Sequence, residues 1–125
     1  MVSAYLKDDS LNYLPVVKAV VHSPLKKKVV ELAIDTGFHG GILIPLRTYV
    51  ELEFNLFEEP KVIAQTAVGG KVELRASKAL IEIDGFRTLC SVYTTLGVRK
   101  SLLGREVLRK IGLLYKPPTK VELEP

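Results

Sequence analysis

Short runs of β-branched and other apolar residues alternate with turn residues along this chain, a pattern typical of β-strands. The predicted strands cover residues 13–21, 29–34, 62–68, 71–76, 80–83, 86–93 and 120–123. Gly69-Gly70 and Asp84-Gly85 each separate two of these runs. Both pairs predict tight hairpin turns, because glycine tolerates a positive φ. The pattern therefore predicts a mainly β chain.

Two segments have the spacing of helices instead. Pro45 can open a short helix in which Leu46, Tyr49 and Val50 share one face. Residues 105–111 predict a clearer helix near the C-terminus, which Gly112 would cap. Its expected apolar stripe is Val107, Leu108 and Ile111, and its expected outward residues are Arg105, Glu106, Arg109 and Lys110. The aromatic residues expected in the core around the short helix are Tyr49, Phe54 and Phe57.

The composition is that of an ordinary globular protein. With 125 residues, of which 47% are hydrophobic and 26% charged, residues 1–125 are expected to form one soluble domain. No apolar run approaches the roughly 20 residues that a membrane helix needs. The first residues also lack the basic and then apolar segments of a secretory signal. We therefore expect no membrane partner.

Cysteine and histidine are scarce. Cys90 is the single cysteine, which excludes an internal disulfide and indicates a reducing, cytoplasmic location. Because His22 and His39 are the only histidines, no set of zinc ligands is available, and neither a metal nor a cofactor is expected. We expect Cys90 to be a small core residue, His39 an exposed loop residue and His22 a structural or solvent-facing one.

The net charge of +4 and the pI of about 9.2 could favour an acidic partner. The one basic block, Lys26-Lys27-Lys28, lies in the turn-like segment SPLKKK and is interpreted as a solvated hairpin tip. No clustered basic residues with aromatic stacking partners accompany it, so no nucleic-acid partner is expected.

Asp35 is the residue that suggests chemistry. The stretch ELAIDTGFHGGILIP, residues 31–45, places Asp35-Thr36-Gly37 directly after an apolar strand. By itself this triplet is explained by turn chemistry, in which the acid accepts backbone N–H groups. A second motif, SLLGREVLRKIGL at residues 101–113, runs from two leucines through a glycine into the late helix.

Together, the two motifs and the glycine hairpin between them resemble the retropepsin-like aspartic proteases, over roughly residues 29–113. The variant D-T-G-F-x-G at residues 35–40 is similar to small prokaryotic members. The resemblance implies a closed β-barrel acid-protease fold with one C-terminal helix, which forms a twofold homodimer. It implies that Asp35 is the catalytic carboxylate and that the loop is supported by Thr36 and Gly37. The implied flap is Val68, Gly69 and Gly70, and the implied support behind the site is Leu103, Gly104 and Arg105.

The chemistry requires a second carboxyl group. Peptide hydrolysis by this route uses two carboxyls about 3 Å apart that share one proton. Asp8 and Asp9 lie in a polar N-terminal stretch and Asp84 in a hairpin turn, so all three are interpreted as surface acids. The second carboxyl is therefore expected from a second copy of the chain, because a twofold axis places Asp35 opposite Asp35.

Two departures from the family pattern keep a second hypothesis open. Phe38 stands where a small residue is common. His39 stands where retroviral members often carry an acid that pairs with the helix-opening arginine, so Arg105 would pair elsewhere, for example with a glutamate. The favoured function is an aspartic endopeptidase that hydrolyses peptide or protein substrates. The alternative is a catalytically inactive retropepsin-fold homodimer that acts as a peptide-binding or assembly module.

Overall fold

The computed structural model describes residues 2–9, 12–65, 70–111, 113–116 and 120–123. These residues form ten strands of one sheet, two α-helices and one 3-10 helix. The strands are β1 (Val2–Asp9), β2 (Asn12–His22), β3 (Lys27–Ile34), β4 (Ile42–Leu43), β5 (Glu59–Gln65), β6 (Lys71–Ile83), β7 (Phe86–Thr94), β8 (Leu102–Leu103), β9 (Leu113–Lys116) and β10 (Lys120–Leu123). The helices are α1 (Leu46–Glu51), η1 (Phe54–Leu56) and α2 (Arg105–Ile111).

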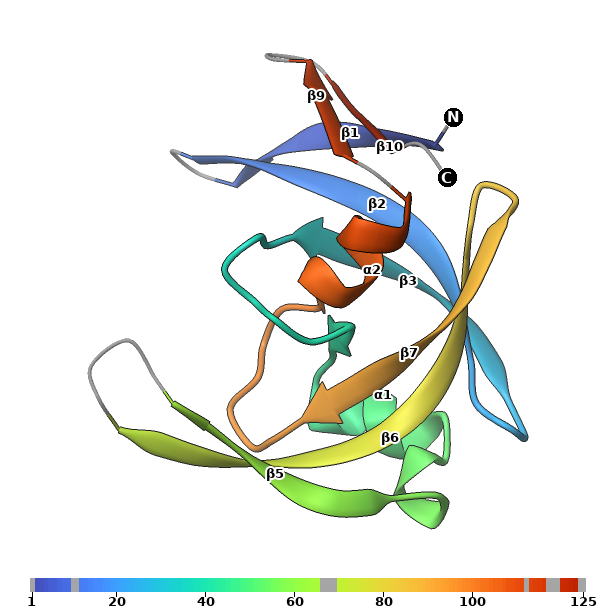
Figure 1. Cartoon of the computed structure of the whole chain (residues 1–125), viewed down its shortest axis with the longest axis vertical. Coiled ribbons are helices and arrows are strands. Elements are labelled where there is room, and N and C mark those ends of the chain that lie inside the picture. Colours follow the sequence, from blue (N-terminus) through green and yellow to red (C-terminus); the bar gives the residue numbers. More distant parts are fainter. Residues whose placement is uncertain (1, 10–11, 66–69, 112, 117–119, 124–125) are drawn as a thin grey trace.

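The strands pair in the order β5-β6-β7-β4-β8-β3-β2-β1-β10-β9. Strand β2 also pairs with β6, so the run from β6 to β2 returns on itself. Figure 1 shows β2 and β6 crossing at one side of the molecule, with β1, β9 and β10 together at one end. The β3–β8 and β4–β7 pairs are parallel. Parallel pairing brings the carboxyl ends of β3 and β8, which carry the two sequence motifs, to the same place.

The hydrophobic core fills the inside of this curved sheet and includes both α-helices. Val107, Leu108 and Ile111 of α2 are all buried, which confirms the predicted apolar stripe. In α1 only Tyr49 is buried, whereas Val50 is 45% exposed.

The prediction that Phe57 belongs to the core is wrong, and Val50 does not share the buried face of Tyr49. The chain leaves α1 through Glu53, which has a left-handed φ of 62°, and this turn brings Phe54 into the core beside Tyr49. Phe57, three residues later, is 40% exposed. Helical spacing could not predict this arrangement, because α1 has only six residues.

The strand predictions were right in kind and incomplete in extent. The runs 71–76 and 80–83 belong to one strand, β6, which continues through the buried Ser77. Four strands lie outside the runs predicted from the hydrophobic pattern: the two-residue strands β4 and β8, and the terminal strands β1, which includes Asp8 and Asp9, and β9. Terminal strands of this kind are specified by the ladders they join more than by their own pattern. The predicted cap at Gly112 lies outside the described residues.

Candidate active site

Asp35 is the first residue after β3, and its backbone remains bound to the neighbouring strand. Its N–H donates to the Leu103 carbonyl oxygen of β8 at 2.9 Å. Its half-buried carboxylate accepts the Gly37 N–H at 2.9 Å through Oδ1. A Cβ atom at Gly37 would lie 3.2 Å from the same oxygen, so glycine allows this close approach. The carboxylate is thus oriented by its own loop, and among the described residues it has no ion-pair partner.

The first turn of α2 holds the loop that follows Asp35. Three alternating carbonyl oxygens of this loop, those of Thr36, Phe38 and Gly40, accept hydrogen bonds from α2. The donors are Arg105 Nε to Thr36 at 2.6 Å, Arg105 N to Phe38 at 2.8 Å and Glu106 N to Gly40 at 3.2 Å. Backbone N–H groups at the start of a helix lack partners within the helix, and here the loop supplies them.

These bonds correct two sequence-based expectations about α2. Arg105 and Glu106 were expected to face outward, but both are half-buried and bonded to neighbouring segments. The partner of Arg105 in this loop is the Thr36 carbonyl oxygen and not the expected glutamate. Glu106 Oε2 accepts the Ser91 N–H of β7 at 3.0 Å, a role that sequence reasoning missed. Its only signal was an acid in the first turn of a helix, which is common to many helices.

Phe38 fits because two glycines leave space around it. Its half-buried ring meets the Tyr93 ring edge-on, with centroids 6.0 Å apart and an interplanar angle of 85°. A Cβ atom at Gly104 would lie 2.2 Å from the Gly40 carbonyl oxygen and 2.6 Å from Phe38 Cδ2. A Cβ atom at Gly40 would lie 2.5 Å from the Tyr93 ring. The large residue after the D-T-G triplet is therefore accommodated behind the loop.

The structure brings most of the sequence-predicted site residues together. Leu103 is buried in β8 beside the end of β3, and Gly104 and Arg105 adjoin the loop that contains Asp35, Thr36 and Gly37. Of the predicted flap residues, Val68 and Gly69 lie outside the described residues, and the exposed Gly70 directly precedes β6. In Figure 1 the β5–β6 hairpin extends to the same side of the molecule as the loop after β3.

The remaining candidate residues, Cys90, His39, His22 and Asp84, do not form a second site. Cys90 is 2% exposed, and burial, with a smaller effect of Glu106, raises the pKa of its thiol to about 12. The burial confirms that Cys90 is a core residue. The raised pKa disfavours the thiolate that a nucleophilic cysteine would need. His39 is exposed, and His22 bonds to Glu82 at 2.7 Å. Asp84 is exposed in the β6–β7 turn, as expected.

Lys26, Lys27 and Lys28 are all exposed in the β2–β3 turn region, in agreement with a solvated hairpin tip. Lys28 pairs with Glu51, and Lys26 lies 3.8 Å from Glu53. Within the described ranges, no three His, Cys, Asp or Glu side chains gather so that they could hold a metal ion. Nor do these ranges contain a helix of the length and apolar character required to cross a membrane.

Comparison of the sequence with protein-family profiles and with curated proteins finds no match. Solved structures do share the fold. EIAV protease complexed with the inhibitor HBY-793 has a TM-score of 0.59 and 18% identity, and the match covers 83% of this chain and 93% of that chain. A retropepsin-like aspartic protease from Rickettsia conorii has a TM-score of 0.63 and 18% identity, over 88% of this chain and 81% of that chain. The predicted likeness to the retropepsin fold is confirmed at the level of the fold.

Proposed function

We propose that this chain is an aspartic endopeptidase whose active site forms between two copies of Asp35 in a twofold homodimer. The proposal is carried by the Asp35 loop. A half-buried carboxylate stands at the end of a core strand, oriented by the Gly37 N–H and held from behind by β8 and α2, in a fold shared with aspartic proteases.

The reaction follows from two carboxyls that share one proton. Two such groups about 3 Å apart cannot both ionise, so one is a carboxylate and the other a carboxylic acid. The carboxylate takes a proton from water as the water oxygen attacks the scissile carbonyl carbon, and the acid donates its proton to the carbonyl oxygen. Collapse of the tetrahedral intermediate breaks the C–N bond, and a proton passes to the leaving amine. One water is consumed, and the proton balance of the pair is restored.

The second carboxyl comes from the partner because the chain's other aspartates belong to elements other than the Asp35 loop. Asp84 lies in the turn between β6 and β7. Figure 1 shows this turn on the opposite side of the molecule from the loop that follows β3. Asp8 and Asp9 belong to β1, which pairs with β2 and β10. A twofold axis beside Asp35 supplies the missing group, because it places each residue opposite its own copy.

The remaining roles belong to the same proposal. Residues 1–125 act as one protease domain with a closed barrel, and a peptide or protein is the substrate. The Thr36 hydroxyl bonds across to the partner's loop, and Gly37 lets the substrate backbone approach. Leu103, Gly104 and Arg105 support the loop from behind. The tip of the β5–β6 hairpin, at Val68, Gly69 and Gly70, closes over the bound peptide.

Asp35→Asn tests the proposal against a matched control, Asp84→Asn. Both changes replace one carboxylate by an isosteric amide, and asparagine tolerates the positive φ of residue 84. We expect Asp35→Asn to lower kcat by about a thousandfold or more, since the amide cannot exchange the proton, while Asp84→Asn cleaves as wild type does. Cleavage of a mixed peptide pool, followed by mass spectrometry across acidic and neutral pH, measures both.

Two outcomes would overturn the proposal. Equal cleavage by wild type and Asp35→Asn would exclude the aspartic mechanism. A wild-type dimer that binds peptides from the pool without cleaving them at any pH would support the non-catalytic peptide-binding module instead.

A further inference from the structure

The β5–β6 hairpin leaves the sheet at Arg75. Strand β6 pairs with β7 from Ile83 only as far as Arg75, which lies opposite Thr94. Beyond this point, the described part of β6 pairs with β5 alone. The β5–β6 register also shifts between Glu59 and Val62, which pair with Ala76 and Leu74, the residues on either side of Arg75. The outer hairpin is thus a two-stranded ribbon, an arrangement that is marginally stable by itself, so its direction depends on its base.

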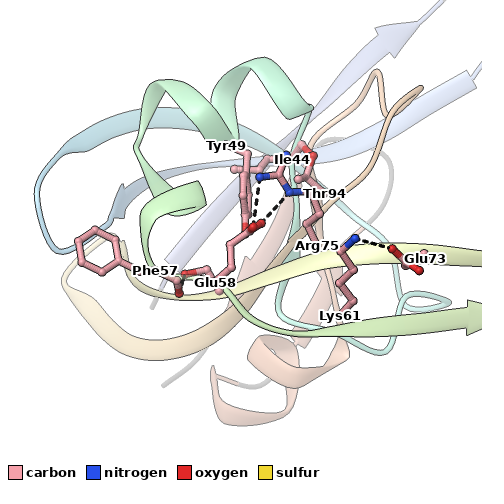
Figure 2. Close-up of polar contacts among 9 residues, drawn as sticks. Ile44, Tyr49, Phe57, Glu58, Lys61, Glu73, Arg75 and Thr94 are labelled. Atoms are coloured by element: carbon pink, nitrogen blue, oxygen red, sulfur yellow. Dashed lines mark hydrogen bonds and ion pairs between the residues drawn. The ribbon is translucent and has the colours of Figure 1, made fainter.

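Three side chains from separate segments meet at this base, and we name them the Tyr49–Glu58–Arg75 clamp (Figure 2). Glu58 directly precedes β5 and accepts two hydrogen bonds from Arg75 of β6, from Nε at 2.7 Å and from Nη2 at 3.1 Å. The Tyr49 hydroxyl of α1 donates to Glu58 Oε2 at 2.9 Å. The Arg75 guanidinium also lies over the Tyr49 ring, 5.7 Å from its centroid.

The clamp joins the base of the hairpin to the hydrophobic core through Tyr49. Tyr49 is fully buried and packs on Phe54, with ring centroids 5.5 Å apart. The side chains of Glu58 and Arg75 are 27% and 35% exposed, so their bidentate pair is partly shielded from water. The buried Ser77 hydroxyl donates to the Phe57 carbonyl at 2.8 Å and ties the same two segments together one step nearer the sheet.

The charge states suit this arrangement. The Arg75 hydrogen bonds hold the pKa of Glu58 below its usual range. Burial, together with the Glu58 bond, raises the pKa of Tyr49. At neutral pH Glu58 is therefore an ionised acceptor and the Tyr49 hydroxyl a donor, so all three groups are mutually satisfied.

We propose that the Tyr49–Glu58–Arg75 clamp is a positioning device that sets the angle at which the β5–β6 ribbon leaves the sheet, and so orients the ribbon over the Asp35 site. The proposal rests on the proposed function in one respect, which is that the ribbon acts as a flap. Lys61 and Glu73 offer a contrast. Their side chains lie 2.9 Å apart across the ribbon and are 64% and 58% exposed, and they join the two strands without tying either to the core.

Hydrogen exchange of the backbone amides tests the clamp independently of any catalysis. Glu58→Gln removes the charge and one of the two acceptor oxygens, and Tyr49→Phe removes the hydroxyl donor, while both keep the shape of the side chain. Glu73→Gln is the matched control on the ribbon. We expect residues 62–65 and 71–74 to exchange about tenfold faster in the clamp variants, with β2 and β3 unchanged. Equal exchange rates of the ribbon amides in Glu58→Gln and Glu73→Gln, or a uniform rise in exchange over the whole chain, would overturn the proposal that the clamp positions the ribbon.

Steady-state kinetics of the same variants test the link to the site. Weakening the clamp lowers the fraction of chains in which the ribbon is closed over the site. KM should therefore rise about fivefold, while kcat stays within about twofold of wild type. A merely structural role would instead reduce the amount of active enzyme and leave KM unchanged. If wild type cleaves no peptide, the proposed function is rejected. The exchange experiment still tests whether the clamp positions the ribbon. Faster local exchange with an unaltered KM would overturn the assignment of the ribbon as a flap.

Discussion

Gly104 shows how little space separates the Asp35 loop from the strand behind it. The nearest atom to a Cβ at this position would be the Gly40 carbonyl oxygen, at 2.2 Å, followed by atoms of Phe38. A backbone oxygen cannot move aside by a change of rotamer. Gly104 is therefore required by close approach, and its φ lies outside the left-handed region.

Gly104→Ala should lower the free energy of unfolding by about 3 kcal/mol, because the added methyl group must displace the Asp35 loop. The comparison is Gly85→Ala, where no atom lies within 4 Å of the added Cβ and the φ of 89° is the only source of strain. That change should cost about 1 kcal/mol. Urea unfolding of both variants measures the difference. A Gly104→Ala protein as stable as Gly85→Ala would contradict the close packing.

At the scale of single residues, sequence reasoning located the acid and its neighbours but missed how they are held. Asp35, Thr36 and Gly37 were recognisable because the three are consecutive, and Leu103, Gly104 and Arg105 for the same reason. The role of Glu106 was missed, because its partner, the Ser91 N–H, is 15 residues away in strand β7. Phe38 departs from the family pattern, and only the packing explains how Gly40 and Gly104 make room for it.

At the scale of elements, α2 and α1 each hold a neighbouring segment in place by hydrogen bonds. The start of α2 binds the carbonyl oxygens of the Asp35 loop, and α1 supplies Tyr49 to the base of the β5–β6 hairpin. The helical pattern predicted α2 well, since its stripe faces the core. It could not predict the Tyr49–Glu58–Arg75 clamp, because these residues are separated by 9 and 17 positions and meet only after the strands pair.

The attachment of the hairpin should depend on pH through Glu58. A carboxyl group whose pKa is lower in the folded state than its usual value of 4.5 stabilises the fold above that value. This contribution is lost as the pH falls through the folded-state pKa. Because the group is partly solvated, the contribution should be about 1 kcal/mol or less.

Urea unfolding of wild type and Glu58→Gln at several pH values measures this effect. The stability difference between the two proteins should be largest near neutral pH and should shrink as the solution is acidified below 4.5. A difference that stays constant down to strongly acidic pH would show that the ionised Glu58 carboxylate is not the stabilising partner of Arg75.

At the scale of the whole molecule, the proposed function requires a second copy. One chain supplies one Asp35. In the fold shared with EIAV protease and the Rickettsia conorii protein, this carboxylate lies at the end of a strand. The backbone of its loop is already hydrogen-bonded to β8 and α2. Each chain therefore supplies half of the proposed site, held in place by hydrogen bonds within that chain.

Light scattering behind a sizing column should give about twice the chain mass of 13.9 kDa over a broad range of concentration. Excess Asp35→Asn chain added to wild type should lower cleavage by forming mixed dimers that hold one carboxylate, whereas excess Asp84→Asn should not. A mass of 13.9 kDa at every concentration would exclude the paired active site.

The sequence by itself determined the mainly β character, the α2 stripe, the place of Asp35 and the likeness to the retropepsin fold. These properties follow from the local hydrophobic periodicity, the turn residues and the contiguous motifs. All of these can be recognised without knowing which distant residues are in contact. Only the tertiary structure decided that β6 is one strand, that Val50 and Phe57 lie outside the core, and that the first turn of α2 holds the Asp35 loop. It also decided that Tyr49, Glu58 and Arg75 form one clamp. Each of these depends on which segments pack together, and that is settled by the burial and hydrogen bonding of the whole chain.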